Sequence, residues 1–337
     1  VLTPQEAEKL FVILNEMRKN NISIILITHK LKEVMDISDR VTVLRKGKLV
    51  GPTVNTSSMT MSSLATQMVG REVIFRLEKS AFDPGDIVLN INKLGIKNKQ
   101  EQEILDNISL EIHEGEILGL AGVAGNGQQE LFDTLVGVTR ASSGQISIGN
   151  KCTTCCSPQE IIKCELSSIP PDRIKQGLIM SFPVSENLIL GRLNEHEFSK
   201  KGFLNKNAID AFATKSIKDF DISVISPSQK TRMLSGGNLQ KIILARELSQ
   251  NPKCVVASSP TRGLDIGATE YVHQFLLNLR QQRVGILLIS EDLDEIFNLA
   301  DRIAVIYRGR IMGYLPPKRE HLETLGLMMA GVQKEIA

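Results

Sequence analysis

The chain has 337 residues, of which 42% are hydrophobic, so it is long enough for about two domains of roughly 150 residues each. Its net charge is only +2, with both signs spread along the chain, which gives no electrostatic reason to expect nucleic acid or an acidic lipid as a partner. The sequence contains no apolar run of about 18 residues and does not begin with a basic segment followed by a hydrophobic one. We therefore expect a cytosolic protein without a membrane span or a signal peptide.

The first predicted elements belong to a segment that the chain contains twice. Residues 2–51 align without a gap with residues 264–313, at a constant offset of 262 residues. The matched positions include Leu14 with Leu276, Arg18 with Arg280, Leu31 with Leu293, Asp39 with Asp301, and Gly47 with Gly309. A match of this length indicates one supersecondary unit that occurs twice.

Each copy has the same predicted order of elements: an amphipathic helix, a buried strand, a short helix, and a second strand that ends in a basic-glycine turn. The buried strands are expected at residues 24–28 and 286–290, and the turns at residues 45–48 and 308–310. This alternation predicts an α/β fold with a largely parallel sheet. The second copy follows a long upstream part that the first copy lacks, so we expect the native protein to begin further upstream.

Between the two copies, residues 71–86 lose the helical period and contain the breaker cluster FDPGD, which predicts a linker. Residues 87–96 and 108–122 then alternate as strands, and the second of these runs directly into the sequence GVAGNGQQE. A helix is predicted from residue 128 to Gly137. The order strand, glycine loop, helix is typical of a phosphate-binding loop.

The glycine loop lacks two residues that a phosphate-binding loop normally uses. Its glycines at template positions are Gly122, Gly125 and Gly127. Gln128 and Gln129 stand where a lysine for the β- and γ-phosphates and a hydroxyl for magnesium are expected. The loop, which also contains Asn126, either holds a nucleotide through its backbone N–H groups or is a glycine turn that binds nothing.

Four of the five cysteines lie close together in the sequence. These are Cys152, Cys155, Cys156 and Cys164. No histidine or second CxxC pair lies nearby to complete four zinc ligands. Reduced thiols in a surface segment are therefore favoured over a zinc site.

The stretch LSGGNLQKIILARELSQNPKCVVASSPTRGLD, residues 234–265, resembles the ATP-binding cassette. The residues that resemble its signature loop are Leu234, Ser235, Gly236, Gly237 and Asn238. A serine and the N–H groups of two adjacent glycines at a helix start make an anion site suited to a γ-phosphate. The resemblance also implies a strand at residues 254–257, and it matches Asp265 to the D-loop aspartate that bridges two cassettes.

The resemblance extends over nearly the whole chain to tandem-cassette ATP-binding subunits of sugar and nucleoside importers, with the nucleoside branch favoured. It rests on the sequences THKLKEVMDISDRVTVLRKGK, LAGVAGNGQQEL, PPDRIKQGL and PTRGLDIGA. In this family two cassettes face each other head to tail, and each nucleotide lies between the phosphate loop of one and the signature loop of the other.

The fold implied by the resemblance is an α/β P-loop NTPase fold with a helical subdomain, preceded by the C-terminal part of a second such domain. Residues 1–70 would belong to the first cassette, 71–86 to the linker, 87–325 to the second cassette, and 326–337 to a tail. Within the second cassette, residues 180–232 are expected to form the helical subdomain that meets the membrane subunits.

By the same resemblance, the second cassette departs from an active ATPase at every catalytic position. Ser258 and Ser259 replace the Asp-Glu pair for the metal and the attacking water, and Glu291 replaces the switch histidine. The repeat pairs Glu291 with His29, which we interpret as the catalytic switch histidine of the first cassette. We therefore expect the second cassette to lend residues 234–238 to the nucleotide of the first, and the chain alone to be inactive.

The resemblance implies a peripheral subunit at the cytoplasmic face of the cell membrane. It would bind ATP and Mg²⁺ at the first-cassette site and work with transmembrane permease subunits and an extracytoplasmic substrate-binding protein. No metal ligand is assigned within this chain, and nucleic acid is not expected as a partner. Two alternatives stay open: a soluble tandem-cassette ATPase that acts on the ribosome or nucleic acid, and a non-catalytic interaction fragment.

Overall fold

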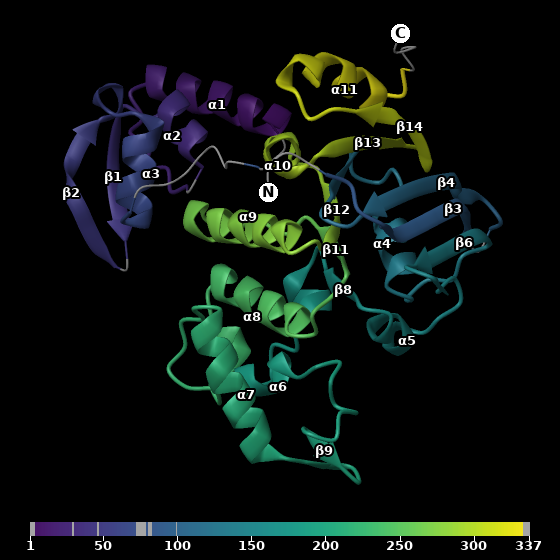
Figure 1. The fold of residues 1–337 in the computed structure, drawn as a ribbon. Helices are drawn as coiled ribbons and strands as arrows, with labels where there is room; N and C mark the ends of the chain where they lie inside the picture. Colours follow the sequence, from purple (N-terminus) through teal and green to yellow (C-terminus); the bar gives the residue numbers. More distant parts are fainter. Residues whose placement is uncertain are drawn as a thin grey trace. The chain divides into compact units, whose positions relative to one another are not determined.

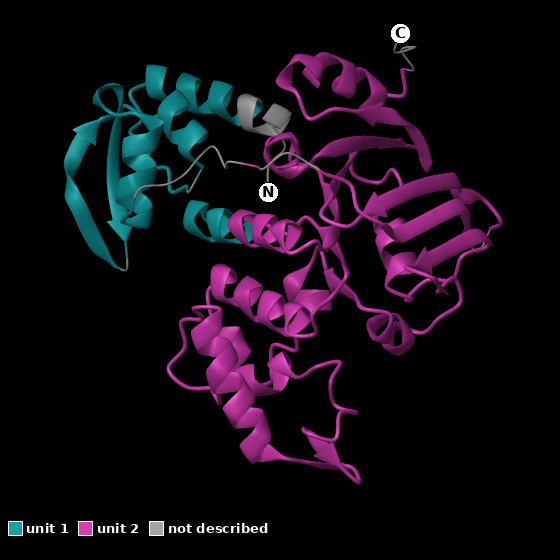
Figure 2. Cartoon of the chain, in the orientation of Figure 1, with its two compact units in different colours: residues 1–76, 263–272 teal, residues 77–262, 273–337 magenta. Residues whose placement is uncertain are grey.

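The computed structural model describes residues 4–28, 30–45, 47–71, 79, 83–98 and 100–332. The chain forms two compact units, shown in different colours in Figure 2. Unit 1 comprises residues 1–76 and 263–272, and unit 2 comprises residues 77–262 and 273–337. Each unit has its own buried apolar cluster and is described here by itself.

Unit 1 is a small α/β unit whose strands form an antiparallel ribbon. Its elements are α1 (Pro4–Lys19), α2 (Leu31–Ile37), β1 (Arg40–Arg45), β2 (Lys48–Asn55), η1 (Thr56–Ser58), α3 (Met61–Val69) and the first part of α9 (Ile266–Gln281). The ribbon pairs Val43 with Val50. Its apolar side packs with α2 and α3 around Leu31, Leu64 and Ala65.

The centre of unit 2 is a six-stranded sheet in the order β14-β13-β5-β12-β11-β8 (Figure 1). Its strands are β5 (Ile117–Ala121), β8 (Leu166–Ile169), β11 (Cys254–Ser258), β12 (Gly285–Ser290), β13 (Arg302–Tyr307) and β14 (Arg310–Leu315). All neighbours are parallel except β13 and β14. The strands β5, β11 and β12 are buried along their full length, which is usual for parallel strands covered on both faces. The prediction of a largely parallel sheet is confirmed.

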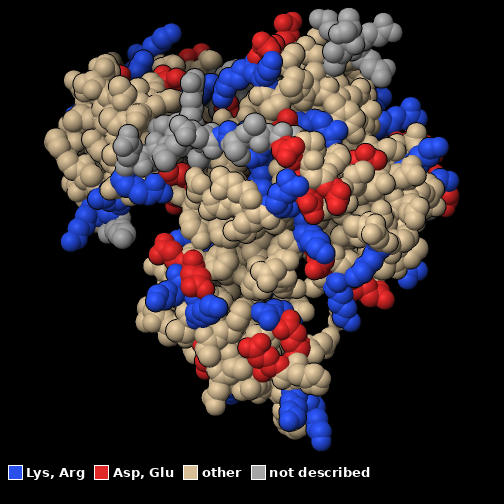
Figure 3. Space-filling model, viewed as in Figure 1, with Lys and Arg blue, Asp and Glu red and all other residues tan. Residues whose placement is uncertain are grey.

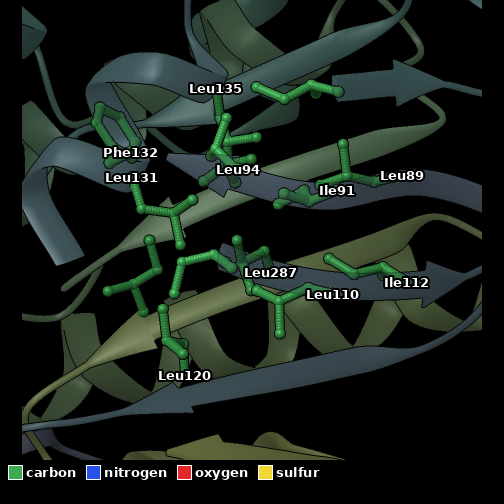
Figure 4. Close-up of a cluster of buried hydrophobic side chains, with 14 of the residues drawn as sticks. Leu89, Ile91, Leu94, Leu110, Ile112, Leu120, Leu131, Phe132, Leu135 and Leu287 are labelled. Carbon is green, nitrogen blue, oxygen red and sulfur yellow. The ribbon is translucent and has the colours of Figure 1, made fainter. Parts of the chain in front are cut away.

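A second, antiparallel sheet follows the linker in sequence and packs on the central one. It has the order β4-β3-β6-β7 and contains β3 (Ile87–Lys97), β4 (Glu103–His113), β6 (Ser143–Ile148) and β7 (Lys151–Cys152). Figure 4 shows how leucine and isoleucine side chains from β3 and β4 meet Leu120 and Leu287 of the central sheet and Phe132 of the following helix. Burial of each such side chain contributes about 1.5–3 kcal/mol, so this cluster holds the two sheets together.

The remaining elements of unit 2 are helices and one hairpin. The helical elements are α4 (Gln128–Leu135), α5 (Pro158–Lys163), η2 (Arg173–Gly177), α6 (Val184–Leu188), α7 (Lys206–Asp219), η3 (Thr231–Met233), α8 (Gly236–Leu248), α10 (Leu293–Leu299), η4 (Arg319–His321) and α11 (Leu322–Met329). The hairpin consists of β9 (Ser199–Lys200) and β10 (Phe203–Leu204). Helices α6 and α7 with this hairpin occupy the expected helical region at residues 180–232. Within the described part of the chain, no helix combines the length and the hydropathy needed to span a bilayer.

The internal repeat is visible in the element boundaries. Each of α1, α2 and β1 begins and ends 262 residues before α9, α10 and β13, respectively. The turns after β1 and β13 both contain a glycine with positive φ, Gly47 at 74° and Gly309 at 73°. Arg18 Nη1 lies 3.0 Å from Asp39 Oδ1, and the equivalent Arg280 Nε lies 2.8 Å from Asp301 Oδ2.

One predicted strand is absent from the first copy. Residues 22–28 form neither helix nor strand, and the side chains of Ile25 and Ile27 are each 93% exposed. In the second copy the equivalent strand β12 lies between β5 and β11 and shares backbone hydrogen bonds with both. Among the described residues of unit 1, β1 and β2 pair only with each other, so no strand is available to residues 22–28. The prediction of a buried strand at residues 24–28 is therefore wrong for this chain, because a parallel strand forms only beside a neighbour.

The two equivalent ion pairs differ in burial, which allows a matched test. The side chains of Arg280 and Asp301 are 4% and 5% exposed, whereas those of Arg18 and Asp39 are 52% and 76% exposed. Asp301 Oδ2 also accepts a hydrogen bond from the backbone N–H of Ile117 at 3.0 Å. Replacing Arg280 therefore leaves the buried Asp301 carboxylate without its guanidinium partner.

We expect Arg280→Ala to lower the free energy of unfolding by about 3 kcal/mol or more, as for other broken buried ion pairs. The matched variant Arg18→Ala should lower it by less than about 1 kcal/mol, because exposed pairs contribute little. Urea-induced unfolding of the two variants measures both values. Equal losses would contradict the role given to the buried pair.

Candidate nucleotide-binding site

The glycine-rich loop leaves the carboxyl end of β5 and leads into α4, as the sequence predicts. Gly125 and Gly127 have φ values of 85° and 104°, which side chains other than glycine rarely adopt. At Gly122 a Cβ atom would lie 2.7 Å from Gln128 Nε2 and 2.8 Å from Ile306 O, so the close packing of the loop also requires glycine there. The loop therefore has the backbone shape of a phosphate-binding loop.

The side chain of Gln128 folds back into the loop instead of extending from it. Its Nε2 atom donates to Val123 O at 3.0 Å, and its Oε1 atom accepts from the backbone N–H of Asn126 at 3.0 Å. In phosphate-binding loops, backbone N–H groups of this kind contact the phosphates. Here the N–H of Asn126 already has a partner within the loop.

Asn126 fixes the loop to the turn between β13 and β14. Its Oδ1 atom accepts from the backbone N–H of Arg308 at 2.7 Å, and its carbonyl oxygen accepts from that of Gly309 at 3.0 Å. Its Nδ2 atom donates to Val123 O at 2.8 Å. Asn126, which the sequence suggested as a cofactor-binding residue, thus has both side-chain polar atoms bonded within the protein.

Gln129 turns away along the first turn of α4. Its Nε2 atom donates to Asp133 Oδ1 at 2.8 Å. Burial raises the pKa of the Asp133 carboxyl above its ordinary value, against the opposing effect of this hydrogen bond. Neither glutamine therefore supplies a positive charge or a hydroxyl to the loop.

The carboxyl ends of β11 and β12 lie at the same edge of the sheet as the glycine loop, because these strands are parallel to β5. Ser258 ends β11 and is buried, and the backbone N–H of Ser259 donates to Ile289 O at 2.7 Å. Glu291 directly follows β12 and is exposed. The three positions that the sequence predicts to be catalytic, occupied here by Ser258, Ser259 and Glu291, thus follow or end strands at the same edge of the sheet as the glycine loop.

A carboxylate that the motif comparison missed lies at this edge. Glu295 is 2% exposed, and its oxygens accept hydrogen bonds from Thr261 Oγ1 at 2.7 Å and Ser290 Oγ at 2.6 Å. His273 Nε2 lies 3.1 Å from Glu295 Oε1. With these partners Glu295 ties the ends of β11 and β12 to α9 and α10.

The repeat could have pointed to Glu295, because Thr28 and Glu33 of the first copy align with Ser290 and Glu295 of the second. At the equivalent positions of the first copy, Thr28 Oγ1 donates to Glu33 Oε2 at 2.7 Å. In both copies the same hydroxyl also accepts a backbone N–H two residues later, from Lys30 and from Asp292, at 3.1 Å each. His29, the predicted catalytic residue, lies between these contacts in sequence but outside the described residues.

The signature residues lie at the start of α8. Ser235 is exposed and precedes the helix, and its Oγ atom accepts from Asn238 Nδ2 at 3.0 Å. Asn238 Oδ1 accepts from the backbone N–H of Ser223 at 2.8 Å, which holds the loop to the segment that follows α7. Gly236 and Gly237 form the first turn, where backbone N–H groups have no partner within a helix. Leu234, half-buried, closes the preceding turn with its N–H bonded to Thr231 O at 3.1 Å.

A second residue that the sequence did not single out supports the signature loop. Asn187 is fully buried in α6, and its Nδ2 atom donates to Thr231 Oγ1 at 2.9 Å. Its side chain also bonds both the N–H and the carbonyl of Ile179, each at 2.9 Å. Asn187 therefore holds three separate segments of the helical region together next to the loop.

The remaining predicted site residue, Asp265, belongs to unit 1. Its Oδ1 atom accepts from the backbone N–H of Ala268 at 2.8 Å, so it caps the start of α9. Within unit 2, no hydrogen bond joins the glycine loop to the signature loop among the described residues. The two loops are separate parts of one cassette-like unit.

Comparison with known proteins identifies this unit. Residues 105–262 match the family model described as ABC transporter. This part of the chain has the fold of an ATP-binding cassette. A nucleotide-free ATP-binding cassette from an ABC transporter has a TM-score of 0.60 and 23% identity, covering 72% of this chain and 96% of that one. Another ABC transporter cassette, in its ADP conformation, has a TM-score of 0.59 and 22% identity, covering 72% and 95%.

Similar sequences with assigned roles extend over nearly the whole chain. The nucleoside import ATP-binding protein NupA of Lactococcus lactis is 42% identical over 98% of this chain and 65% of its own length. The guanosine import ATP-binding protein NupO of Bacillus subtilis is 43% identical over 99% and 66%. The glucose import ATP-binding protein TsgD13 of Haloferax volcanii is 40% identical over 98% and 60%. The chain thus spans less than two thirds of the length of these relatives.

The segment that contains Cys152, Cys155, Cys156 and Cys164 follows β6, and all five cysteines of the chain are free thiols. Cys152 and Cys155 are exposed, Cys156 and Cys164 are half-buried, and Cys254 is buried in β11. The described residues hold no group of three or more His, Cys, Asp or Glu side chains arranged for a metal ion.

These thiols should differ in reactivity toward iodoacetamide at neutral pH. Hydrogen bonding, chiefly with Thr154, holds the pKa of the Cys152 thiol below its ordinary value, whereas burial raises the pKa of Cys254 to about 12. Because the thiolate is the nucleophile, Cys152 should be labelled readily and Cys254 only after unfolding. Mass spectrometry of the labelled peptides checks this.

Thr154→Val should slow the labelling of Cys152 because it removes the hydroxyl 3.4 Å from the sulfur, with Cys155 as an internal reference in the same peptide. Early labelling of Cys254 would contradict the packing of β11.

Proposed function

We propose that the chain is part of the ATP-binding subunit of an ABC importer for a nucleoside or a simple sugar. The observation that carries this proposal is the 42% and 43% identity, over 98% and 99% of the chain, to subunits named for nucleoside and guanosine import. Similarity to glucose and ribose import subunits supports the wider class of substrates. A soluble cassette protein acting on the ribosome or on nucleic acid is disfavoured by these names and by the missing phosphate-loop lysine.

The subunit would contain two cassettes in one polypeptide. We assign residues 1–70 to the C-terminal part of the first, residues 71–86 to a linker, residues 87–325 to the second and residues 326–337 to a tail. The repeat supports this division, because unit 1 reproduces elements that in unit 2 complete a central sheet. The exposed apolar side chains of Ile25 and Ile27 support it as well, since strands on both sides would bury them.

In this proposal the second cassette does not hydrolyse ATP and does not hold it in its phosphate loop. Gln128 already bonds the N–H of Asn126, and Ser258 and Ser259 offer no carboxylate for Mg²⁺ or for the attacking water. ATP and Mg²⁺ would bind at the first-cassette site, with His29 from the first cassette and residues 234–238 from the second. Asp265 would take part in the contact between the cassettes.

The partners of the subunit would be transmembrane permease subunits and an extracytoplasmic substrate-binding protein, which places it at the cytoplasmic face of the membrane. Unit 2 offers a groove of about 330 Å³ for a permease segment, lined by residues of α5, η2, the segment after α6 and the end of α8. Among its lining residues are Ile179, Leu190, Lys175 and Gln250, of which Lys175 is exposed. Apolar side chains beside a charged one suit a short amphipathic segment.

The division of roles can be tested after the upstream half of the first cassette has been added by fusion. Ser235→Arg should lower ATP turnover by more than about a hundredfold, because it blocks the donors that would stabilise the γ-phosphate. The matched variant Ser259→Ala should leave turnover nearly unchanged. Phosphate release with Mg²⁺ measures both turnover rates. An equal loss of turnover in the two variants would contradict the proposal that only the first-cassette site hydrolyses ATP.

A further inference from the structure

The hairpin β9–β10 projects from the helical region of unit 2, away from the central sheet (Figure 1). Its strands pair Phe203 with Lys200 and Leu204 with Ser199. The connecting turn has positive φ at Lys201 and Gly202, 50° and 84°, which suits the tight turn of a two-residue hairpin loop. The hairpin is thus a defined turn with its own backbone pairing.

The base of the hairpin is firmly held. The fully buried ring of Phe198 packs edge-on against Phe212, with ring centroids 5.3 Å apart. The guanidinium of Arg192 lies 4.7 Å from the first ring centroid and 4.8 Å from the second, and it makes two hydrogen bonds to Glu195 of 2.8 and 2.6 Å. The backbone N–H of Asn205 closes the base on Phe198 O at 2.9 Å. The tip is therefore carried on a rigid support.

The tip itself combines exposed apolar and basic side chains. Phe203 is 81% exposed and Leu204 is 48% exposed. Lys200, Lys201 and Lys206 are exposed, and residues 198–206 contain no Asp or Glu. None of these three lysines forms an ion pair with another described residue. Figure 3 shows basic side chains at the end of unit 2 where Figure 1 draws β9.

We propose that this tip binds the headgroup layer of an anionic phospholipid membrane. An aromatic ring held out from the protein gains by entering the interface between headgroups and acyl chains, and lysines beside it are attracted to a negative surface. The positive charge of the tip complements a negative membrane surface, although the net charge of the whole chain does not predict membrane binding. A protein socket fits less well, because the hairpin projects outward and residues 198–206 carry three lysines and no acid, the nearest acids in sequence, Glu195 and Glu197, lying before the hairpin base.

The inference deepens the proposed membrane location and uses no nucleotide site. If the hairpin does not bind lipid, the proposed transport function is unaffected, because the turnover test above examines that function separately. A lipid contact at this hairpin would also orient unit 2 on the membrane independently of any permease.

Co-sedimentation of the whole chain with lipid vesicles tests the proposal. The chain should bind vesicles that contain phosphatidylglycerol and should not bind vesicles of phosphatidylcholine alone. Phe203→Ala should weaken the binding by about tenfold or more, because the ring no longer enters the interface. Lys200→Gln with Lys201→Gln should weaken it by about 30-fold, as expected for two lysines near an anionic surface.

Matched controls come from the same helical region. Ile225→Ala removes an apolar side chain that is 92% exposed but lies outside the hairpin. Lys215→Gln with Lys218→Gln removes two exposed lysines of α7. Both controls should bind anionic vesicles like the unchanged chain. The proposal is overturned if the chain does not bind these vesicles, or if the controls lose as much affinity for them as the tip variants do. It is also overturned if the tip variants bind the vesicles normally and lose affinity only for a permease subunit.

Discussion

The structure depends on one constraint: a parallel strand needs a hydrogen-bonded neighbour along its edges. The strand β12 has β11 on one side and β5 on the other, and all its residues are buried. The glycine loop, the serine pair and Glu291 follow the carboxyl ends of these three strands, so the pairing brings them together. The equivalent residues 22–28 lack such neighbours, and there the same kind of sequence stays exposed.

The chemistry of the loops follows from which polar groups already have partners. The loop after β5 keeps the glycines and the backbone shape that phosphate binding requires, but Gln128 and Asn126 bond its polar groups within the protein. At the start of α8 the first-turn N–H groups have no helical partner, as at the start of α4, and Ser235 is exposed. What distinguishes the loop after β5 is that Gln128 bonds the N–H of Asn126 and that no lysine is present, which supports a cassette that lends its signature loop.

Much of the fold could be predicted from the sequence, because the repeat, the glycine loop and the hydrophobic alternation are local patterns. The order of elements in the second copy, the strand that begins at Ile87 and the helix after the signature loop appear as predicted. The missing strand at residues 24–28 could not be predicted from a local pattern, since its formation depends on distant neighbours. Glu295 and Asn187 were missed for the same reason: their roles come from hydrogen bonds between segments far apart in sequence. The roles of His29 and the signature residues stay predictions.

Calorimetric titration of the chain with ATP and Mg²⁺, together with an assay of phosphate release, tests the central claim most directly. Without the phosphate-loop lysine, and with Gln128 bonded inside the loop, the account predicts no turnover and no binding at ATP concentrations up to about 1 mM. Magnesium-dependent ATP turnover by the chain would contradict the claim that the second cassette neither hydrolyses nor binds ATP. Saturable ATP binding that Gln128→Ala abolishes would contradict it as well.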